Sequence, residues 1–201
     1  MRKFKVKIRG VTDYIQHKMP YGEEAEKMKH VTKVLQQNPD DKEAYMTEAK
    51  ISLYKTEDGT VYLPATQLKG SLLEAGKEIR VEGKGKSTYK KIVGAFMFIE
   101  PEKIPITRNG IPIKVEFDDT NLTIRRDWVV IQRSRILRTR PVIKEGWEAE
   151  FTLVVLDDTI PVDIIKDLLK TAGLFKGIGD WRPQKGGPYG TYEVVSFEQI
   201  Q

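Results

Sequence analysis

The stretch GLFKGIGDWRPQKGGPYGTYEVV, residues 173–195, carries the clearest indication of the fold. It contains six of the sixteen glycines: Gly173, Gly177, Gly179, Gly186, Gly187 and Gly190. The same stretch holds cations and aromatic side chains, among them Trp181, Tyr189 and Tyr192. Glycine is favoured where φ must be positive or where the backbone must approach another group closely. A loop over 173–190 with this composition indicates a backbone-lined contact surface for phosphates or for another chain. The alternative is a long connection that only returns the chain to a sheet.

Regular elements are predicted on both sides of this glycine-rich loop. Pro161 suits the first turn of a helix over 161–172, in which Ile164, Ile165, Leu168 and Leu169 recur on one face. Residues 147–155 before it alternate between apolar and polar, and a strand is expected over 191–197 after it. The carboxy-terminal third therefore predicts a strand, a helix, a glycine-rich loop and a strand.

The first strand of the chain is predicted over 3–11. Phe4, Val6 and Ile8 share its apolar face, and the other face carries four cations with no acid among them: Lys3, Lys5, Lys7 and Arg9. This pattern favours an anion-binding sheet, although lysines also form the ordinary solvated face of an edge strand.

Two helices are predicted over 23–37 and 41–54, and Asp41 is expected to cap the second. Together they predict a helical insertion over 23–55. A turn at Asp58-Gly59 and a strand over 60–63 follow. The next helix is expected to be capped by Thr66 and closed by Gly76, with Lys69 and Ser71 facing away from its apolar row.

A flexible basic loop is predicted over 82–91, where four lysines accompany two glycines: Lys84, Lys86, Lys90 and Lys91. Gly85-Lys86-Ser87 does not complete a phosphate-binding P-loop, because Arg80 stands where that motif requires its first glycine. A buried strand over 92–99, a hairpin turn at Asn109-Gly110 and a strand over 111–117 are expected next.

Residues 125–140 contain six arginines and one acid, Asp127. A single strand over 128–142 with a β-bulge near Ile136-Leu137 would bring four of the arginines to one face: Arg133, Arg135, Arg138 and Arg140. Arginine suits bidentate phosphate contacts and base stacking, so nucleic acid is favoured over the alternative of surface ion pairs.

Composition excludes several classes of protein. Hydrophobic residues make up 39% and charged residues 31%, the net charge is +5, and no apolar run is long enough for a membrane span or a signal peptide. We therefore expect a cytoplasmic protein without membrane contact. Without cysteine and with two histidines, no disulfide, thiol nucleophile or histidine-rich metal site is expected, and no cofactor; a carboxylate Mg²⁺ site stays open.

Two motifs in this order resemble the RAMP superfamily of CRISPR-associated proteins. LPATQLKGSL, residues 63–72, resembles that family's proline–small–small–x–leucine–lysine–glycine segment, and residues 177–195 resemble its carboxy-terminal glycine-rich loop. Within the superfamily, the chain is most similar to the backbone subunits that polymerise along a guide RNA. It also resembles uncharacterised prophage proteins that end in a loop like 179–183. The sequence departs from the family at Asp180, Trp181 and Arg182, where small residues are more usual.

The resemblance implies a single α+β domain over 1–201, with a modified ferredoxin-like, RRM-related antiparallel sheet and two core helices. It also implies RNA or single-stranded DNA bound across the sheet and loops, with subunits side by side as a homo-oligomer or ribonucleoprotein in antiviral defence.

Three hypotheses follow. The first is a non-catalytic protein that oligomerises along RNA or single-stranded DNA, with the expected contact residues Lys5, Lys7, Arg9, Lys69, Lys84, Lys86, Lys90, Lys91, Arg133, Arg135, Arg138, Arg140, Trp181, Arg182, Lys185 and Tyr189. Trp181 and Tyr189 are the candidate stacking platforms. The second is a metal-independent RNA endonuclease that uses His17 as general acid or base. The third is a phage structural or assembly protein in which the same aromatic and arginine side chains anchor protein contacts.

Overall fold

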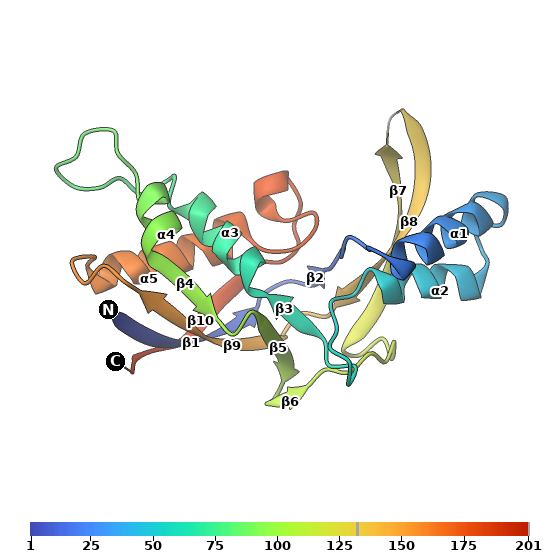
Figure 1. Ribbon diagram of the computed structural model, residues 1–201, viewed down its shortest axis with the longest axis horizontal. Helices are drawn as coiled ribbons and strands as arrows, with labels where there is room; N and C mark the ends of the chain where they lie inside the picture. The colour runs from blue at the N-terminus through green and yellow to red at the C-terminus, as the bar shows by residue number, and fades with distance from the viewer. Residues whose placement is uncertain (132, 201) are drawn as a thin grey trace.

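Four antiparallel strands form the central sheet of the computed structural model, which describes residues 1–131 and 133–200 (Figure 1). Their order across the sheet is β10 (Tyr192–Gln199), β1 (Arg2–Gly10), β9 (Glu148–Val155) and β4 (Met97–Glu100). Numbered along the chain, this is the order 4-1-3-2 of a ferredoxin-like sheet. The predicted α+β, ferredoxin-like class is confirmed.

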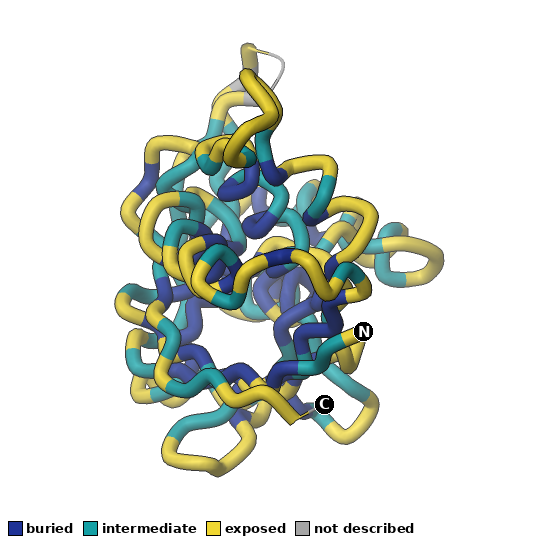
Figure 2. The backbone as a smooth tube through the Cα atoms, turned by 90° about the vertical axis from the view of Figure 1, so that its left-hand side faces the viewer, coloured by how far each residue is buried: buried dark blue, intermediate teal, exposed yellow. Residues whose placement is uncertain are grey.

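Two core helices cover one face of this sheet, α3 (Ala65–Ala75) and α5 (Val162–Thr171). Phe4, Val6 and Ile8 of β1 point to that side and are fully buried, as the alternation predicts. After α5 come a π-helical turn, η1 (Ala172–Lys176), and a 3₁₀ turn, η2 (Pro183–Lys185). The amino and carboxyl ends lie side by side in Figures 1 and 2, where Ile200 donates a backbone hydrogen bond to Lys3.

A second, three-stranded sheet carries the helical pair. It consists of β2 (Tyr14–Ile15), β8 (Ser134–Ile143) and β7 (Leu122–Ile131), and the last two form a long hairpin. Helices α1 (Glu23–Gln37) and α2 (Lys42–Ile51) lie beside this hairpin, and Asp41 caps α2 by accepting a hydrogen bond from the Ala44 amide. The hairpin extends from the body of the protein (Figure 1), and Val130, Arg133 and Arg135 near its turn are exposed.

Short strands complete the main sheet. β3 (Tyr62–Pro64) pairs with β5 (Lys103–Arg108), and β5 turns through Asn109-Gly110 into β6 (Ile111–Pro112). That hairpin turn is where the sequence predicts it, and both turn residues have positive φ. The prediction of a strand over 111–117 is wrong beyond Pro112, where β6 ends. None of the described helices is long and apolar enough to cross a membrane.

The buried strand expected over 92–99 is also wrong in its first half. Residues Lys90–Phe96 form α4, and the strand begins only at Met97. Tyr89, Val93 and Met97 are the buried positions, and their spacing of four residues is that of a helix.

Helix α3 differs from the prediction at two positions. It begins at Ala65, one residue before the expected cap Thr66, because Pro64 ends β3 and leads directly into the first helical turn. Ser71 does not face away from the core. It is buried, and its hydroxyl donates to the Ala172 carbonyl at 2.9 Å, which joins α3 to the start of η1.

The single bulged strand expected in the arginine-rich region is a hairpin instead. Ile131 pairs with Ser134, and the register of β7 against β8 continues to Ile143 without a shift. Arg133 lies in the turn with a φ of 68°. Arg135 therefore stays on the opposite strand parity from Arg138 and Arg140, and no bulge joins the four on one face.

Candidate nucleic-acid interface

Three of the four predicted cations on the open face of β1 pair with acids on the neighbouring strand β9, whereas Lys3 lies opposite Val154 and forms no ion pair among the described residues. Lys5 pairs with Glu150 at 3.1 Å, and Lys7 and Arg9 both pair with Glu148, at 3.1 and 3.2 Å. Burial opposes ionisation of Glu148, but the two cations prevail and lower its pKa. The open face of the sheet is therefore a surface of cross-strand ion pairs rather than a continuous cationic surface.

Lys69 is held by its own chain. Its ammonium group donates to the backbone carbonyls of Val93 and Gly94 in α4 and of Met97, the first residue of β4. Partial burial lowers the pKa of Lys69. The geometry assigns this lysine to fixing α4 on α3.

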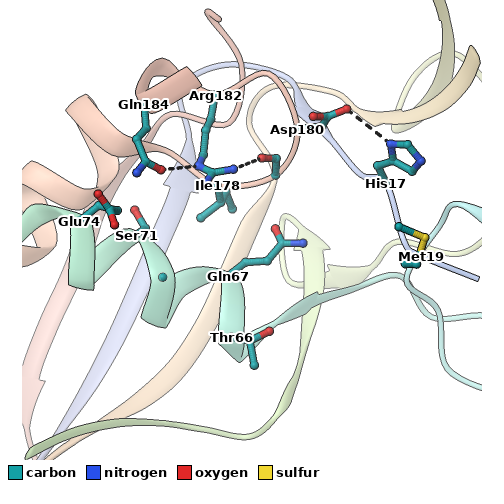
Figure 3. A pocket seen from close by; sticks show the side chains of 12 residues that line it. His17, Met19, Thr66, Gln67, Ser71, Glu74, Ile178, Asp180, Arg182 and Gln184 are labelled. Carbon is teal, nitrogen blue, oxygen red and sulfur yellow. Dashed lines mark hydrogen bonds and ion pairs between the residues drawn. The ribbon is translucent and has the colours of Figure 1, made fainter. Parts of the chain in front are cut away.

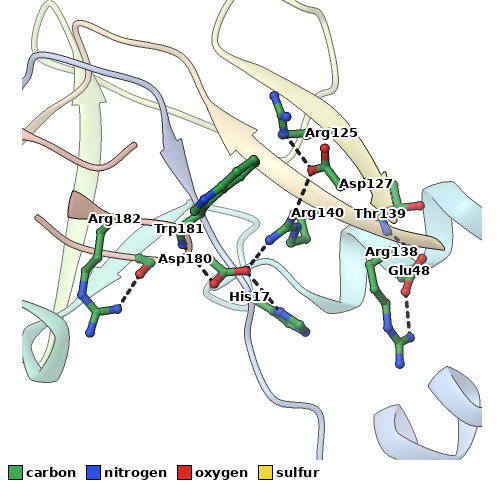
Figure 4. Close-up of polar contacts among 11 residues, drawn as sticks. His17, Glu48, Arg125, Asp127, Arg138, Thr139, Arg140, Asp180, Trp181 and Arg182 are labelled. Atoms are coloured by element: carbon green, nitrogen blue, oxygen red, sulfur yellow. Dashed lines mark hydrogen bonds and ion pairs between the residues drawn. The ribbon is translucent and has the colours of Figure 1, made fainter. Parts of the chain in front are cut away.

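Arg138 and Arg140 hold the hairpin to the rest of the protein (Figure 4). Arg138 donates to Glu48 of α2 at 3.1 Å. Arg140 is buried and bridges two carboxylates, Asp127 at 2.7 Å and Asp180 at 2.6 Å. Their surroundings match the ion-pair alternative left open by the sequence.

Asp180 of the glycine-rich loop lies at the centre of this network. The His17 side chain is its first partner, with 3.7 Å between His17 Nδ1 and a carboxylate oxygen, and Arg140 is the second. Both interactions lower the pKa of Asp180 against the opposing effect of burial. Asp180 thus ties the segment after β2 and the β7–β8 hairpin to the loop (Figure 4).

Trp181 and Tyr189, the two predicted stacking residues, enclose Arg125. The Arg125 guanidinium lies 5.1 Å from the Trp181 ring centroid and 5.3 Å from that of Tyr189, and it donates to the Tyr189 hydroxyl at 2.7 Å. Trp181 nevertheless remains 39% exposed. It therefore keeps accessible ring surface.

The density of glycine in the loop reflects close packing of the loop on itself. A Cβ at Gly187 would lie 1.9 Å from the Trp181 carbonyl oxygen, and one at Gly190 would lie 1.9 Å from that of Ile178. No side chain fits at these distances, so both positions require glycine to form the loop at all.

A polar pocket of about 440 Å³ lies between α3, the glycine-rich loop and the segment after β2 (Figure 3). Arg182 forms part of the loop wall, where it donates to the Gly179 carbonyl at 2.8 Å and to Gln184 at 3.0 Å. His17 is half exposed at one side of the pocket. The sequence-based prediction did not include several of its lining residues among the candidate site residues: Thr66, Gln67, Gly70, Glu74 and Gln184. The spacing of Gln67, Gly70 and Glu74 on one face of a predicted helix was the available signal.

The remaining predicted cations are exposed and form no ion pair among the described residues: Lys84, Lys86, Lys90, Lys91, Arg133, Arg135 and Lys185. They lie on three segments, the loop over 82–91 with the start of α4, the hairpin tip and η2. In Figure 1 these segments lie on the upper side of the view with α3 and α4, and the β10–β1–β9 strands lie below.

Trp128 and Val130 near the hairpin tip are exposed apolar residues that were not among the predicted site residues. They are 61% and 69% exposed, and their cross-strand partners are Leu137 and Arg135. Cross-strand partners share a face, so an aromatic ring and an arginine without an acid lie together there.

Within the described residues, no group of three or more histidine, aspartate or glutamate side chains is arranged to hold a metal ion.

The chain is similar in structure to solved proteins, but it matches none by sequence. No family model and no curated protein matches the chain. Among solved structures it is similar to a chain described as "Type IV-B CRISPR Complex", with a TM-score of 0.45 and 10% identity over 96% of this chain and 90% of that one. We base no inference on a similarity of this degree.

Proposed function

We propose that the protein binds single-stranded nucleic acid, with RNA as the first candidate, along the side that carries α3, α4 and the glycine-rich loop. It does so without catalysis, as a subunit of a nucleoprotein assembly. The observation that carries this proposal is the separation of the cations into two sets. Lys5, Lys7 and Arg9 on the open sheet face are matched by acids. The cations of the loop over 82–91, the start of α4, the hairpin tip and η2 are exposed and form no ion pair among the described residues.

Free cations are the groups that phosphates would contact. A cation already paired with a carboxylate must give up that pair to bind a phosphate, whereas Lys84, Lys86 or Arg135 gives up only water. Phosphate binding by these cations releases counterions, so the affinity should fall steeply with salt. This leaves Lys5, Lys7, Arg9, Lys69, Arg138 and Arg140 as residues that maintain the fold in this proposal.

The test compares two sets of neutralised cations. One variant combines Lys84→Gln, Lys86→Gln and Arg135→Gln, and the control combines Lys5→Gln and Lys7→Gln on the sheet face. The affinity for a labelled RNA of about 30 nucleotides is measured by fluorescence anisotropy at several salt concentrations. We expect the first variant to bind more weakly, with a salt slope reduced by about 0.7 for each lost contact to the strand.

The control should keep the wild-type affinity and slope. Equal losses in both variants would place the strand on the sheet face instead, and a wild-type protein that shifts neither RNA nor single-stranded DNA would overturn the proposal. The same titration with DNA of the same sequence identifies the preferred strand.

His17 supports a second candidate, RNA cleavage without a metal. Its imidazole lines the pocket, and the Asp180 carboxylate lies near Nδ1, which would orient the ring with Nε2 available for proton transfer. Cleavage of RNA in the presence of a chelator, lost in His17→Ala and kept in the control His30→Ala, would establish this activity. Intact RNA after prolonged incubation would remove it.

A further inference from the structure

We propose that the pocket between α3 and the glycine-rich loop accepts one unstacked nucleobase of the bound strand. This inference rests on the proposed function and adds which part of the nucleic acid enters the protein. The base class is one that carries an amino group, which is adenine, guanine or cytosine.

Gly70 gives the first reason. It lies inside helix α3, where glycine is less favourable than alanine, and one reason to have glycine there is a neighbour with which a side chain would collide. At Gly70 a Cβ would meet no atom within 4 Å, and the open space is the pocket itself. The fold therefore does not require glycine here. A ligand that packs flat against the helix backbone would.

The side chains on either side of Gly70 give the second reason. Gln67 and Glu74 lie on the same face of α3, two helical turns apart, which is about 10 Å along the axis. Gln67 Oε1 accepts from the Tyr14 hydroxyl at 2.8 Å, so its amide NH₂ is the group left to donate to a ligand. Glu74 supplies an acceptor at the other end, with its charge balanced by Lys77 at 2.6 Å.

Groups this far apart would contact opposite sides of a base that lies flat on Gly70, where one side offers an amino donor and the other an acceptor. A carboxylate accepts from the amino group of a base, and an amide NH₂ donates to a ring nitrogen or carbonyl. Figure 3 shows Gln67 directed into the space between α3 and the loop, with Ser71 and Glu74 further along the same helix.

Charge argues against a phosphate at the same position. Glu74 and Asp180 both line the pocket, and Asp180 is held in its ionised form by His17 and Arg140. Each carboxylate is already paired with a cation, Glu74 with Lys77 and Asp180 with Arg140, and Arg182 donates to its own loop. The described lining residues therefore offer a phosphate no free cation, whereas a neutral base needs none. Phosphates of the same strand would instead contact exposed cations such as Lys185, which lies on the loop beside the pocket.

The experiment uses strands in which 2-aminopurine, a fluorescent base quenched by stacking, replaces one base at a time. With wild-type protein we expect fluorescence to rise several-fold at particular positions of the strand. Gly70→Leu, which places a side chain in the pocket, should abolish this rise. Its affinity for the strand should change by less than about threefold, and its salt slope should stay close to that of the wild type. Gly94→Leu is the matched control, because Gly94 is an exposed glycine in α4 that does not line the pocket.

Gly70→Ala checks that the fold does not require glycine at this position, because alanine favours the helix and should raise the midpoint of thermal unfolding by a few degrees. The thermal midpoint of Gly70→Leu itself shows whether that variant folds. Salt-dependent strand binding with no fluorescent rise at any position would overturn the pocket proposal and leave the proposed function standing. The same conclusion follows if Gly70→Leu keeps the rise. Failure of the wild-type protein to bind any strand would overturn both.

Discussion

Arg140 is the residue on which the contact between the hairpin and the glycine-rich loop depends. Its guanidinium is the shared partner of Asp127 and Asp180, and its side chain is only 8% exposed. Arg140→Gln would leave two carboxylates together without their cation, and we expect the free energy of unfolding to fall by about 3 kcal/mol. Urea denaturation measures this.

Arg135→Gln is the control for that substitution, since Arg135 lies on the same strand, is exposed and forms no ion pair among the described residues. It should change the free energy of unfolding by less than about 0.5 kcal/mol. Similar losses in the two variants would show that the buried bridge does not stabilise the fold.

Asp180 predicts a pH dependence of stability. His17 first, and then Arg140, hold its folded-state pKa below the value of about 3.9 expected for an unfolded chain. The contribution is therefore fully present above about pH 4 and is lost as the pH falls through the folded-state value. Asp180→Asn should be less stable than wild type near pH 7, and the difference should narrow below about pH 4. Parallel stability curves across this range would contradict the assignment.

At the scale of elements, the hairpin tip carries a testable aromatic contact. Trp128 is exposed beside Arg135, so removing its ring costs little packing but removes a surface on which a base can stack. We expect Trp128→Ala to weaken strand binding by roughly 1–3 kcal/mol, with little change in the thermal midpoint. Phe175→Ala, at an exposed aromatic residue of η1, is the control and should bind as wild type does. Equal affinities for all three proteins would exclude the tip from the interface.

The elements that the sequence predicted well have one buried face and a clear period. Strands β1 and β9 alternate between apolar and polar residues, and α5 carries four apolar residues on one face. In each case the burial of one face produces the pattern. The β7–β8 hairpin was missed because its strands carry arginines on both faces, some buried in ion pairs and some exposed. Hydrophobic period cannot locate a turn in such a segment.

At the scale of the whole molecule, the site could be predicted only in part. Residue type identified the cations, but whether each one is free depends on partners far along the chain, such as Glu150 opposite Lys5 or Asp180 opposite Arg140. The pocket is formed by three segments that meet only in the folded protein. Contacts between segments far apart in the chain leave no local pattern in a single sequence. Of the residues that line the pocket, only His17 and Arg182 were therefore among the predicted site residues.

The assembly state follows from the same distribution of surfaces. Exposed cations without ion pairs favour copies that line up on a strand. Phe175, Val195 and Ile200 are exposed apolar residues, on η1, on β10 and just beyond it, and are available for protein contacts. Size-exclusion chromatography with absorbance at 260 and 280 nm separates the two contributions. We expect the purified protein to elute as a large species rich in 260 nm absorbance, and to become small after nuclease treatment in high salt, because phosphate contacts then no longer hold the copies together. A large species that keeps its size after this treatment, with no excess absorbance at 260 nm, would instead favour an assembly protein held together by exposed apolar residues, and the strand would have no part in holding it together.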